Sequence, residues 1–521
     1  MIWHIFKKDS RLLWPLVLIV AMVHVVSASL WIRLGRFDEP RDLVLTAYLL
    51  PLLGLLGIVI LTVAELHQDA LPGVRQDWLV RPVNRRHLFL AKLLFVLVMV
   101  QGPLLAAQMI EALVDGFPLL AALDAASANG LTVLCLFTLP AMVLGAVTQT
   151  MTEAILGGVA VVIAGAMIMV LLSFMGAFPP PTGGSGLIWM VLTVWASLAA
   201  VGSTLILTLQ FARRQTKQSR YLAVGTAILA LFAFFIPWKP LFAIQQWLAP
   251  NRGAGQSVAV VLDLGAEKAH STAGSNASAA YLPLRIAGLP AHSILFADRA
   301  DIQISDLSGA ILYRGTSHLS IDGKGSMRDA QLEVRKDQYP GDMAPIYQKI
   351  FLPAKVYATV MNRPVRMVVD YSLTLFSLAS TDSIAAIDGD RRVQNIGWCA
   401  TKVDDDGDGV VVSCLSTGET KLCFTAYLQH EPSGRRNPEN HVCRPWYSPH
   451  AAGGFPDVLS HFGGELPFMD PSGLAKYPVD GSQLAQSRVV LESYQAQDHF
   501  TRRLVIPSIR LSDLSSAAKG G

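Results

Sequence analysis

The residues whose types and spacing could do chemistry fall into two segments of this 521-residue sequence. The first runs from Glu65 to Lys92 and places acidic, aromatic and basic side chains between two strongly apolar stretches. The second, toward the carboxyl end, holds four of the five cysteines and the acidic run Asp404-Asp-Asp-Gly-Asp-Gly409. Charged loops bind charged partners, and clustered thiols form disulfides or hold metal ions. The functional hypotheses therefore rest on these two segments.

The cysteines of the second segment predict two disulfides. Cys399, Cys414, Cys423 and Cys443 form an even cluster, which is typical of a domain in an oxidising compartment. Sequential pairing, Cys399 with Cys414 and Cys423 with Cys443, closes the shortest loops, and we expect it ahead of the other two pairings. A zinc site is the alternative, although the spacing contains no C-x-x-C.

The acidic run matches the first half of a calcium-binding loop at Asp404, Asp406 and Asp408. Leu415 stands where such a loop carries its bidentate Glu. A solvated turn within the cysteine cluster therefore explains the run better, and calcium is the alternative. We expect no other metal site and no bound cofactor.

Motifs of the common enzyme classes are absent from the sequence. It contains no G-x-x-x-x-G-K-[ST], no H-E-x-x-H and no G-x-S-x-G. We therefore expect neither a nucleotide site nor a catalytic site in this chain. The one enzymatic alternative is a transferase that uses lipid-linked sugars, because Asp38-Glu39 lies in an outer loop where such enzymes carry a catalytic acid. The neighbouring Arg36 and Arg41 favour a neutralised loop instead.

Composition separates the chain into two parts that position these segments. Hydrophobic residues make up 52% of the chain and charged residues 16%, against about 25% charged in a typical soluble domain. Residues 1–240 hold only 16 of the 42 Lys and Arg and 11 of the 39 Asp and Glu. A membrane part, residues 1–238, therefore precedes a water-facing part, residues 239–521. This composition excludes a soluble enzyme, a disordered chain and a nucleic-acid-binding protein.

Seven apolar stretches in the membrane part approach the length of about 20 residues that a bilayer core requires. They are Leu12–Ile32, Leu43–Ala64, Leu93–Val114, Leu131–Val147, Ala154–Phe174, Leu187–Leu209 and Tyr221–Trp238. Lys and Arg gather at the N-terminus and in the loops before the third and seventh stretches, so we predict that these loops are cytoplasmic. Residues 115–130 then form an external loop. Seven spans place the water-facing part outside the inner membrane of a bacterium, in the periplasm or beyond.

The water-facing part is predicted to be mainly β. Short apolar or alternating runs such as Val365–Leu375, Leu422–Leu428 and Arg503–Leu511 are separated by Gly, Pro, Asp and Ser. This spacing predicts a β-sandwich, or two small ones.

Polar residues inside the predicted spans are candidates for a transport pathway, because polar groups are costly in lipid. These candidates are His24, Gln101, Gln108 and Glu111. Glu111 lies near the end of its stretch and is expected at the outer interface rather than in a cavity. His24 is expected to make a hydrogen bond between helices rather than to bind a ligand.

The loop that ends at Lys92 carries charges that helix stability does not explain. Asn84 is a favourable N-cap, so a helix is predicted to begin there and continue into the third span. Arg85 and Arg86 then lie in its first turn, where positive charge opposes the helix dipole by ~0.3–1 kcal/mol each. Three explanations remain for these two arginines. They set the orientation of the chain in the membrane and do nothing else, they bind lipid phosphates, or they bind an acidic protein.

Two membrane helices joined by such a loop resemble the permease subunits of type-2 ABC transporters. The matching positions are Glu65, Gly73, Trp78, Leu79, Arg81, Pro82, Val83, Asn84, Arg85, Arg86 and Lys92. Phe6-Lys7-Lys8-Asp9 before the first span is also similar to that family, and the resemblance covers about residues 1–215. A seventh span and the water-facing part depart from the family pattern.

The resemblance implies the permease subunit of an exporter in which a separate chain hydrolyses ATP. The loop would be the coupling helix that docks in a groove of the ATPase, and the permease would act as a homo- or heterodimer in the lipid bilayer. A membrane-anchored sensor whose outer domain binds a ligand is the main alternative, and the sugar transferase is the lesser one. The substrate is not readable from the sequence.

Overall fold

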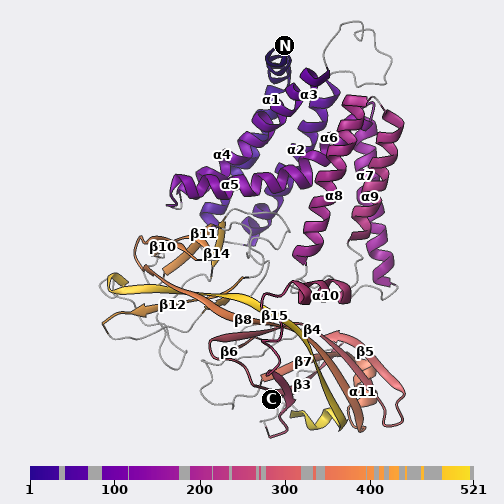
Figure 1. Cartoon of the computed structure of the whole chain (residues 1–521), viewed down its shortest axis with the longest axis vertical. Helices are drawn as coiled ribbons and strands as arrows, with labels where there is room; N and C mark the ends of the chain where they lie inside the picture. The colour runs from indigo at the N-terminus through magenta and orange to yellow at the C-terminus, as the bar shows by residue number, and fades with distance from the viewer. Residues whose placement is uncertain are drawn as a thin grey trace.

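A computed structural model of the chain shows a helical bundle followed by a mainly-β part (Figure 1). The structure describes residues 1–34, 41–68, 85–114, 116–174, 188–213, 215–233, 238–265, 269–270, 277–317, 333–335, 346–394, 396–403, 410–415, 422–432, 440–442, 459–462 and 484–516.

The bundle consists of the helices before residue 234. They are α1 (Ile2–Leu34), α2 (Arg41–His67), α3 (Arg85–Phe95), α4 (Gln101–Val114), α5 (Leu119–Val133), α6 (Leu139–Val147), α7 (Met151–Phe174), α8 (Ile188–Thr208) and α9 (Thr216–Ala233). The π-helical segment η2 (Val96–Val100) joins α3 to α4, and η3 (Leu134–Thr138) joins α5 to α6. A third π-helical segment, η4 (Leu209–Arg213), extends α8. A separate helix, α10 (Trp238–Leu248), leads into the β part.

The helices have the length and composition of a membrane bundle. Five in the described part are long and apolar enough to cross a membrane, namely Ile2–Leu30, Leu49–His67, Arg86–Val114, Leu119–Val147 and Thr193–Arg213. A sixth is added if α9 and α10, which meet at 82°, form one broken span, and α7 contributes a shorter apolar helix. Helices thus cover most of each predicted stretch, but the predicted number of seven spans is not confirmed.

Most of residues 115–130 are helical, so the external loop predicted there is wrong. α5 begins at Leu119, directly after Pro118, whose ψ of 144° is extended. Its first turns bury four alanines, at positions 121, 122, 125 and 126. Alanine is the best helix former, and its small side chain lets α5 pack closely on α4. Only a short turn therefore connects these two helices.

The largest sheet of the β part is organised by two long antiparallel strands, β8 (Val365–Ala385) and β15 (Ser487–Ile509). Its order is β13 (Asn440–Val442), β12 (Leu422–His430), β15, β8, β4 (Ser293–Ser305) and β5 (Ile311–Ser317), and β6 (Glu333–Arg335) also pairs with β4. Register shifts at Ser493/Tyr494, Ala496/Asp498 and Ile506/Ile509 interrupt the β8–β15 ladder. Such irregularities bend strands and change which face a side chain points to.

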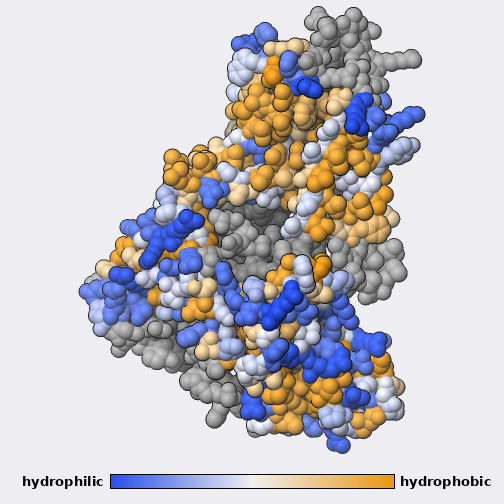
Figure 2. Space-filling model, in the orientation of Figure 1, coloured by the Kyte–Doolittle hydropathy of each residue, from blue (hydrophilic) through white to orange (hydrophobic). Residues whose placement is uncertain are grey.

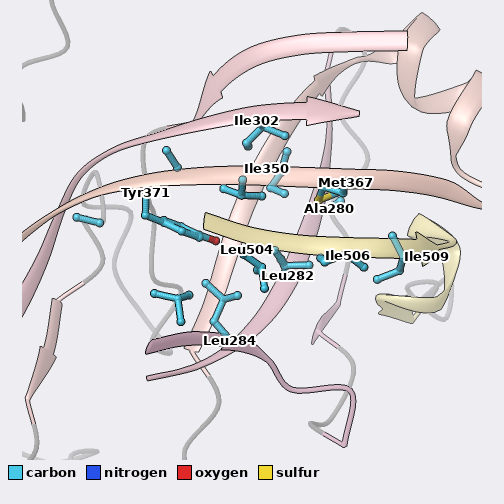
Figure 3. Packing of buried hydrophobic residues seen from close by; sticks show 14 of the residues in the cluster. Ala280, Leu282, Leu284, Ile302, Ile350, Met367, Tyr371, Leu504, Ile506 and Ile509 are labelled. Carbon is cyan, nitrogen blue, oxygen red and sulfur yellow. The ribbon is translucent and has the colours of Figure 1, made fainter. Parts of the chain in front are cut away.

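A smaller sheet packs on one half of the long strands. It has the order β1 (Ala259–Leu262), β3 (Ala277–Ala287) and β7 (Ile346–Pro353), and α11 (Ala354–Val360) follows β7. Buried residues of both sheets form a single core (Figure 3). Burial raises the pKa of the Tyr371 phenol. The hydroxyl group therefore stays protonated and donates a hydrogen bond to Gln348 Oε1, 2.5 Å away.

A third sheet packs on the other half of the long strands. Its order is β14 (Leu459–Phe462), β11 (Val410–Leu415), β10 (Gly397–Val403) and β9 (Asp390–Val393). Residues such as Val412, Ile384 and Leu491 share a second core between this sheet and the long strands. A short pair, β2 (Ala269–His270) with β16 (Ser515–Ser516), completes the strands of the described part. The mainly-β prediction is therefore confirmed, whereas a true sandwich stays a prediction.

The two ends of the bundle differ in their surroundings. We call the end where α1 and α3 begin the basic end, and the opposite end, which contacts the β part, the sheet end (Figure 1). Hydrophobic residues dominate the visible surface of the helices, and hydrophilic residues dominate that of the β part near the bundle (Figure 2). This contrast follows the division into a membrane part and a water-facing part.

Candidate functional site at the basic end of the bundle

Three charged side chains are buried together at the basic end. Lys92 of α3 places its Nζ 3.0 Å from Asp9 Oδ2 of α1 and 3.2 Å from Glu65 Oε1 of α2. The same Nζ donates a hydrogen bond of 2.8 Å to the backbone oxygen of Glu65. All three residues are at most 1% exposed. We call Asp9, Glu65 and Lys92 the acid–base cluster.

The acid–base cluster carries two carboxylates for one ammonium group. Lys8 Nζ lies 3.3 Å from Asp9 Oδ1, and the Lys8 side chain is 53% exposed, so a second positive charge reaches the cluster from solvent. Desolvation of a charge costs several kcal/mol unless partners compensate it. The cluster is therefore formed only when α1, α2 and α3 are in register, and it fixes these three helix ends relative to one another.

Apolar packing surrounds the acid–base cluster and explains its burial. Phe6 lies in edge-to-face contact with Phe95, with ring centroids 6.4 Å apart. Both belong to one apolar core with Leu13, Ile58 and other residues of the same helices. Phe95 and Lys92 lie three residues apart on one face of α3. Because the Phe95 ring packs in the apolar core, the Lys92 ammonium group on the same face is also buried.

A second set of polar contacts joins the other helices at this end. His67 Nε2, at the end of α2, lies 3.2 Å from Thr148 Oγ1 after α6. Arg220 Nε of α9 donates to Val147 O at 2.9 Å, and its guanidinium lies 3.7 Å from Glu153 of α7. These polar contacts tie α2, α7 and α9 to the end of α6 at the basic end.

The predicted loop residues are only partly described. The structure brings together Glu65 and Lys92, the first and last residues of the predicted loop, and places Arg86 exposed in the first turn of α3. α3 begins at Arg85, as expected if Asn84 is the N-cap, and the side chain of Arg85 is not described. Gly73, Trp78, Leu79, Arg81, Pro82, Val83 and Asn84 lie outside the described residues, as do Asp38 and Glu39.

Asp9 is the member of the acid–base cluster that the sequence does not predict as a site residue. A carboxylate eight residues into an apolar helix is a signal in itself, because a buried acid requires a cation. The sequence does not show which cation, since Lys92 is 83 residues away.

The polar residues predicted within the spans lie in two places. His24 packs on α2, where a Cβ added to Gly54 would meet its ring at 2.7 Å. His24 therefore contacts another helix, but no hydrogen-bond partner of its Nε2 is found in the described part of the chain, so the predicted hydrogen bond stays a prediction. Gln101 and Glu111 are buried on α4, and Gln108 is partly buried there. Glu111 lies at the sheet end, next to the α4–α5 turn.

Gln101 connects the ends of two π-helical segments by a hydrogen bond. Its Nε2 donates to Thr138 Oγ1 at 2.7 Å, and η2 ends directly before Gln101 while η3 ends at Thr138. A Cβ added to Gly130 would meet the Leu105 side chain at 2.8 Å, so the two helices are in close contact here. π-Helical segments are frequent at functional sites. A pathway through these residues nevertheless stays a prediction.

The disulfide prediction is confirmed for one pair. Cys399 and Cys414 are directly opposite in the β10–β11 ladder and are bonded to each other. Because these two sulfur atoms form a disulfide, they are not thiolate ligands for the alternative zinc site. Cys423 lies in β12 without a described side chain, and Cys443 lies outside the described residues.

The calcium candidates Asp404, Asp406 and Asp408 also lie outside the described residues. Within the part of the chain that the structure describes, no group of three or more His, Cys, Asp and Glu side chains is placed to hold a metal ion.

The disulfide-bonded hairpin rests on the sheet end of the bundle. Ala400 and Leu415 share a core with Phe117 and the buried alanines at the α4–α5 turn. Lys402 Nζ donates to Val114 O, the last residue of α4, at 3.2 Å. The β part is therefore in contact with the end of the helical run Arg86–Val114, which carries Lys92 near its start.

Searches against models of known protein families and against characterised proteins find no match for this chain. The function is therefore inferred from the geometry of the site.

Proposed function

We propose that this chain is the permease subunit of an ABC exporter, which couples ATP hydrolysis in a separate chain to substrate movement across a bacterial inner membrane. The observation that carries the proposal is the acid–base cluster. Lys92, at one end of the basic loop, is bound both to Glu65 at the other end of the loop and to Asp9 of α1. A force applied to this loop by a partner would therefore move three helices together.

The distribution of charge supports the orientation that this function requires. Positive residues near membrane helices favour the cytoplasm. Lys7, Lys8, Arg86 and Lys217 all belong to the basic end, so this end would face the cytoplasm and the ATPase. The β part, sandwich-like in each half as its two cores suggest, would then lie in the periplasm. A buried disulfide suits that oxidising compartment.

A dimer of permease subunits, identical or different, would provide the second half of a transport pathway. Gln101, Gln108 and Glu111 lie on the helix that connects the basic end to the sheet end, and they are the residues we propose for that pathway. The chain would bind no cofactor itself, and ATP would act through the partner ATPase.

The experiment is affinity purification of the full-length chain followed by identification of co-purifying P-loop ATPases. The test variant reverses two charges in the loop, Arg85→Glu with Arg86→Glu. The matched control reverses two exposed charges elsewhere at the basic end, Arg213→Glu with Lys217→Glu. We expect the test variant to lose the ATPase and the control to retain it. The proposal fails if the test variant binds the ATPase at normal stoichiometry or if the parent binds none.

A sensor is the second candidate, and the contact between Lys402 and Val114 favours it. A ligand that moves the β10–β11 hairpin would move the α4–α5 turn and pass a signal inward without transport. This function requires no ATPase, so the purification of the parent chain separates the two candidates.

A further inference from the structure

The helix α10 has apolar residues on two different faces. Leu241 and Phe242 are buried, together with Gln245. Ile244, Trp247 and Leu248, spaced as one helical stripe, are 45%, 67% and 50% exposed. The polar residues Lys239 and Gln246 form a narrow strip between the two apolar faces. A helix of a soluble domain would bury its second apolar face or replace it with polar residues.

The buried face attaches α10 firmly to the β part. The ring of Phe242 lies edge-to-face on His499 of β15, with centroids 6.3 Å apart. The guanidinium of Arg299 in β4 lies 5.7 Å from the ring centroid of Trp238. The turn that follows α10 is held by Asp498 Oδ2, which accepts hydrogen bonds of 3.0 Å from the backbone of Gly253 and Gly255. These contacts orient α10 on the large sheet.

The exposed face of α10 lies at the boundary of the bundle. α9 packs beside α8, one of the membrane-type helices, and ends at Ala233. α10 starts at Trp238 and is turned by 82° from α9 (Figure 1). If α9 crosses the bilayer, a helix at this angle runs along the membrane plane. Because its buried face is occupied by the sheet, the stripe of Ile244, Trp247 and Leu248 is directed away from the sheet.

We propose that α10 is an interfacial helix and that its exposed stripe is a binding surface for membrane lipid at the sheet end. Trp and aliphatic residues on one face are typical of helices that lie in the headgroup region. The exposed Arg252, whose guanidinium lies 5.8 Å from the ring centroid of Trp247, supplies a positive charge for lipid phosphates at the same place. The occupant is thus the outer layer of the bilayer that the neighbouring helix crosses. This inference rests on the membrane bundle and not on the proposed transport function.

The consequence is that the β part is held on the membrane at two separate points. One point is the contact of the β10–β11 hairpin with the α4–α5 turn, and the other is the lipid-bound α10. Between them lie the long strands β8 and β15. The large sheet would therefore lie across the membrane surface instead of standing away from it.

The test is photo-crosslinking of the full-length chain in vesicles of phosphatidylethanolamine and phosphatidylglycerol. Benzoylphenylalanine replaces Trp247 in one variant and Leu248 in a second. The matched control carries it at Leu307, an apolar residue that is 62% exposed on the turn between β4 and β5. Mass spectrometry then counts lipid adducts and protein adducts at each position.

We expect lipid adducts at both α10 positions to exceed those at position 307 by about tenfold or more, since burial of a Leu-sized side chain favours an apolar phase by at least that factor. Crosslinks from 247 and 248 to the bundle or to a second copy of the chain would overturn the proposal. Equal lipid labelling at position 307 would overturn it as well. Neither outcome depends on whether an ATPase binds the basic end.

Discussion

Replacement of Lys92 by methionine is the sharpest test of the acid–base cluster. Methionine keeps the unbranched shape of the side chain but removes the charge that lies 3.0 Å from Asp9 and 3.2 Å from Glu65. Two buried carboxylates then lose their common partner, and removal of one partner from a buried ion pair costs about 3–5 kcal/mol. At roughly 2–4 °C per kcal/mol for a part of this size, the midpoint of thermal unfolding should fall by about 6–20 °C.

The assay is thermal unfolding of the detergent-solubilised chain, followed by the light scattering of the aggregating protein. Lys8→Met is the matched control, because it removes the same kind of charge from the same Asp9. The Lys8 side chain is 53% exposed, so the loss should stay within about 1 kcal/mol. A third variant, Asp9→Asn with Glu65→Gln and Lys92→Met, removes all three charges and should recover most of the stability. The reasoning is refuted if Lys92→Met is as stable as Lys8→Met, or if the triple variant is no better than the single one.

Two further predictions concern the sheet end and the middle of the bundle. Cys399→Ala with Cys414→Ala opens a loop of 15 residues and should destabilise the β part by about 3 kcal/mol. The measurement compares the midpoint of thermal unfolding of the variant with that of the oxidised and the reduced parent chain. An unchanged midpoint would show that the hairpin is held by packing alone. Gly130→Leu should disrupt the contact with Leu105 at a cost of about 1–3 kcal/mol, whereas Gly102→Ala, where an added Cβ meets nothing within 4 Å, should be tolerated. Similar thermal stability of the two glycine variants would contradict the close approach of α4 and α5.

The sequence predicted local features where one property dominates. Uninterrupted apolar stretches have to be helices in lipid, and helices do cover most of each stretch. α3 begins at Arg85, directly after the residue that the sequence predicts as its N-cap. The Cys399–Cys414 bond follows from the short spacing of two cysteines on successive strands. In each case the relevant neighbours are close in the sequence.

Features that depend on distant segments could not be predicted in the same way. The partnership of Asp9 with Lys92 requires α1 and α3 to lie side by side, which the pattern of either helix does not specify. The prediction of a loop at residues 115–130 was wrong. It rested on the absence of Lys and Arg, which bears on membrane orientation but not on secondary structure. The buried alanines form a helix there because they pack on α4. The docking of α10 also depends on His499, which is more than 250 residues away in the sequence.

One continuous helix connects the two ends of the bundle, and this gives the separate observations a common consequence. Residues Arg86–Val114 form a single helical run of 29 residues, or about 43 Å at 1.5 Å per residue. Lys92, near its start, is fixed to Asp9 and Glu65, and Val114, at its end, accepts the hydrogen bond from Lys402 of the β part. Between them η2 replaces α-helical hydrogen bonds with wider π-type bonds, and helices bend most readily at such segments. A displacement of the basic loop would therefore have a direct route to the β10–β11 hairpin through this helix, provided that the acid–base cluster holds and η2 does not absorb the motion.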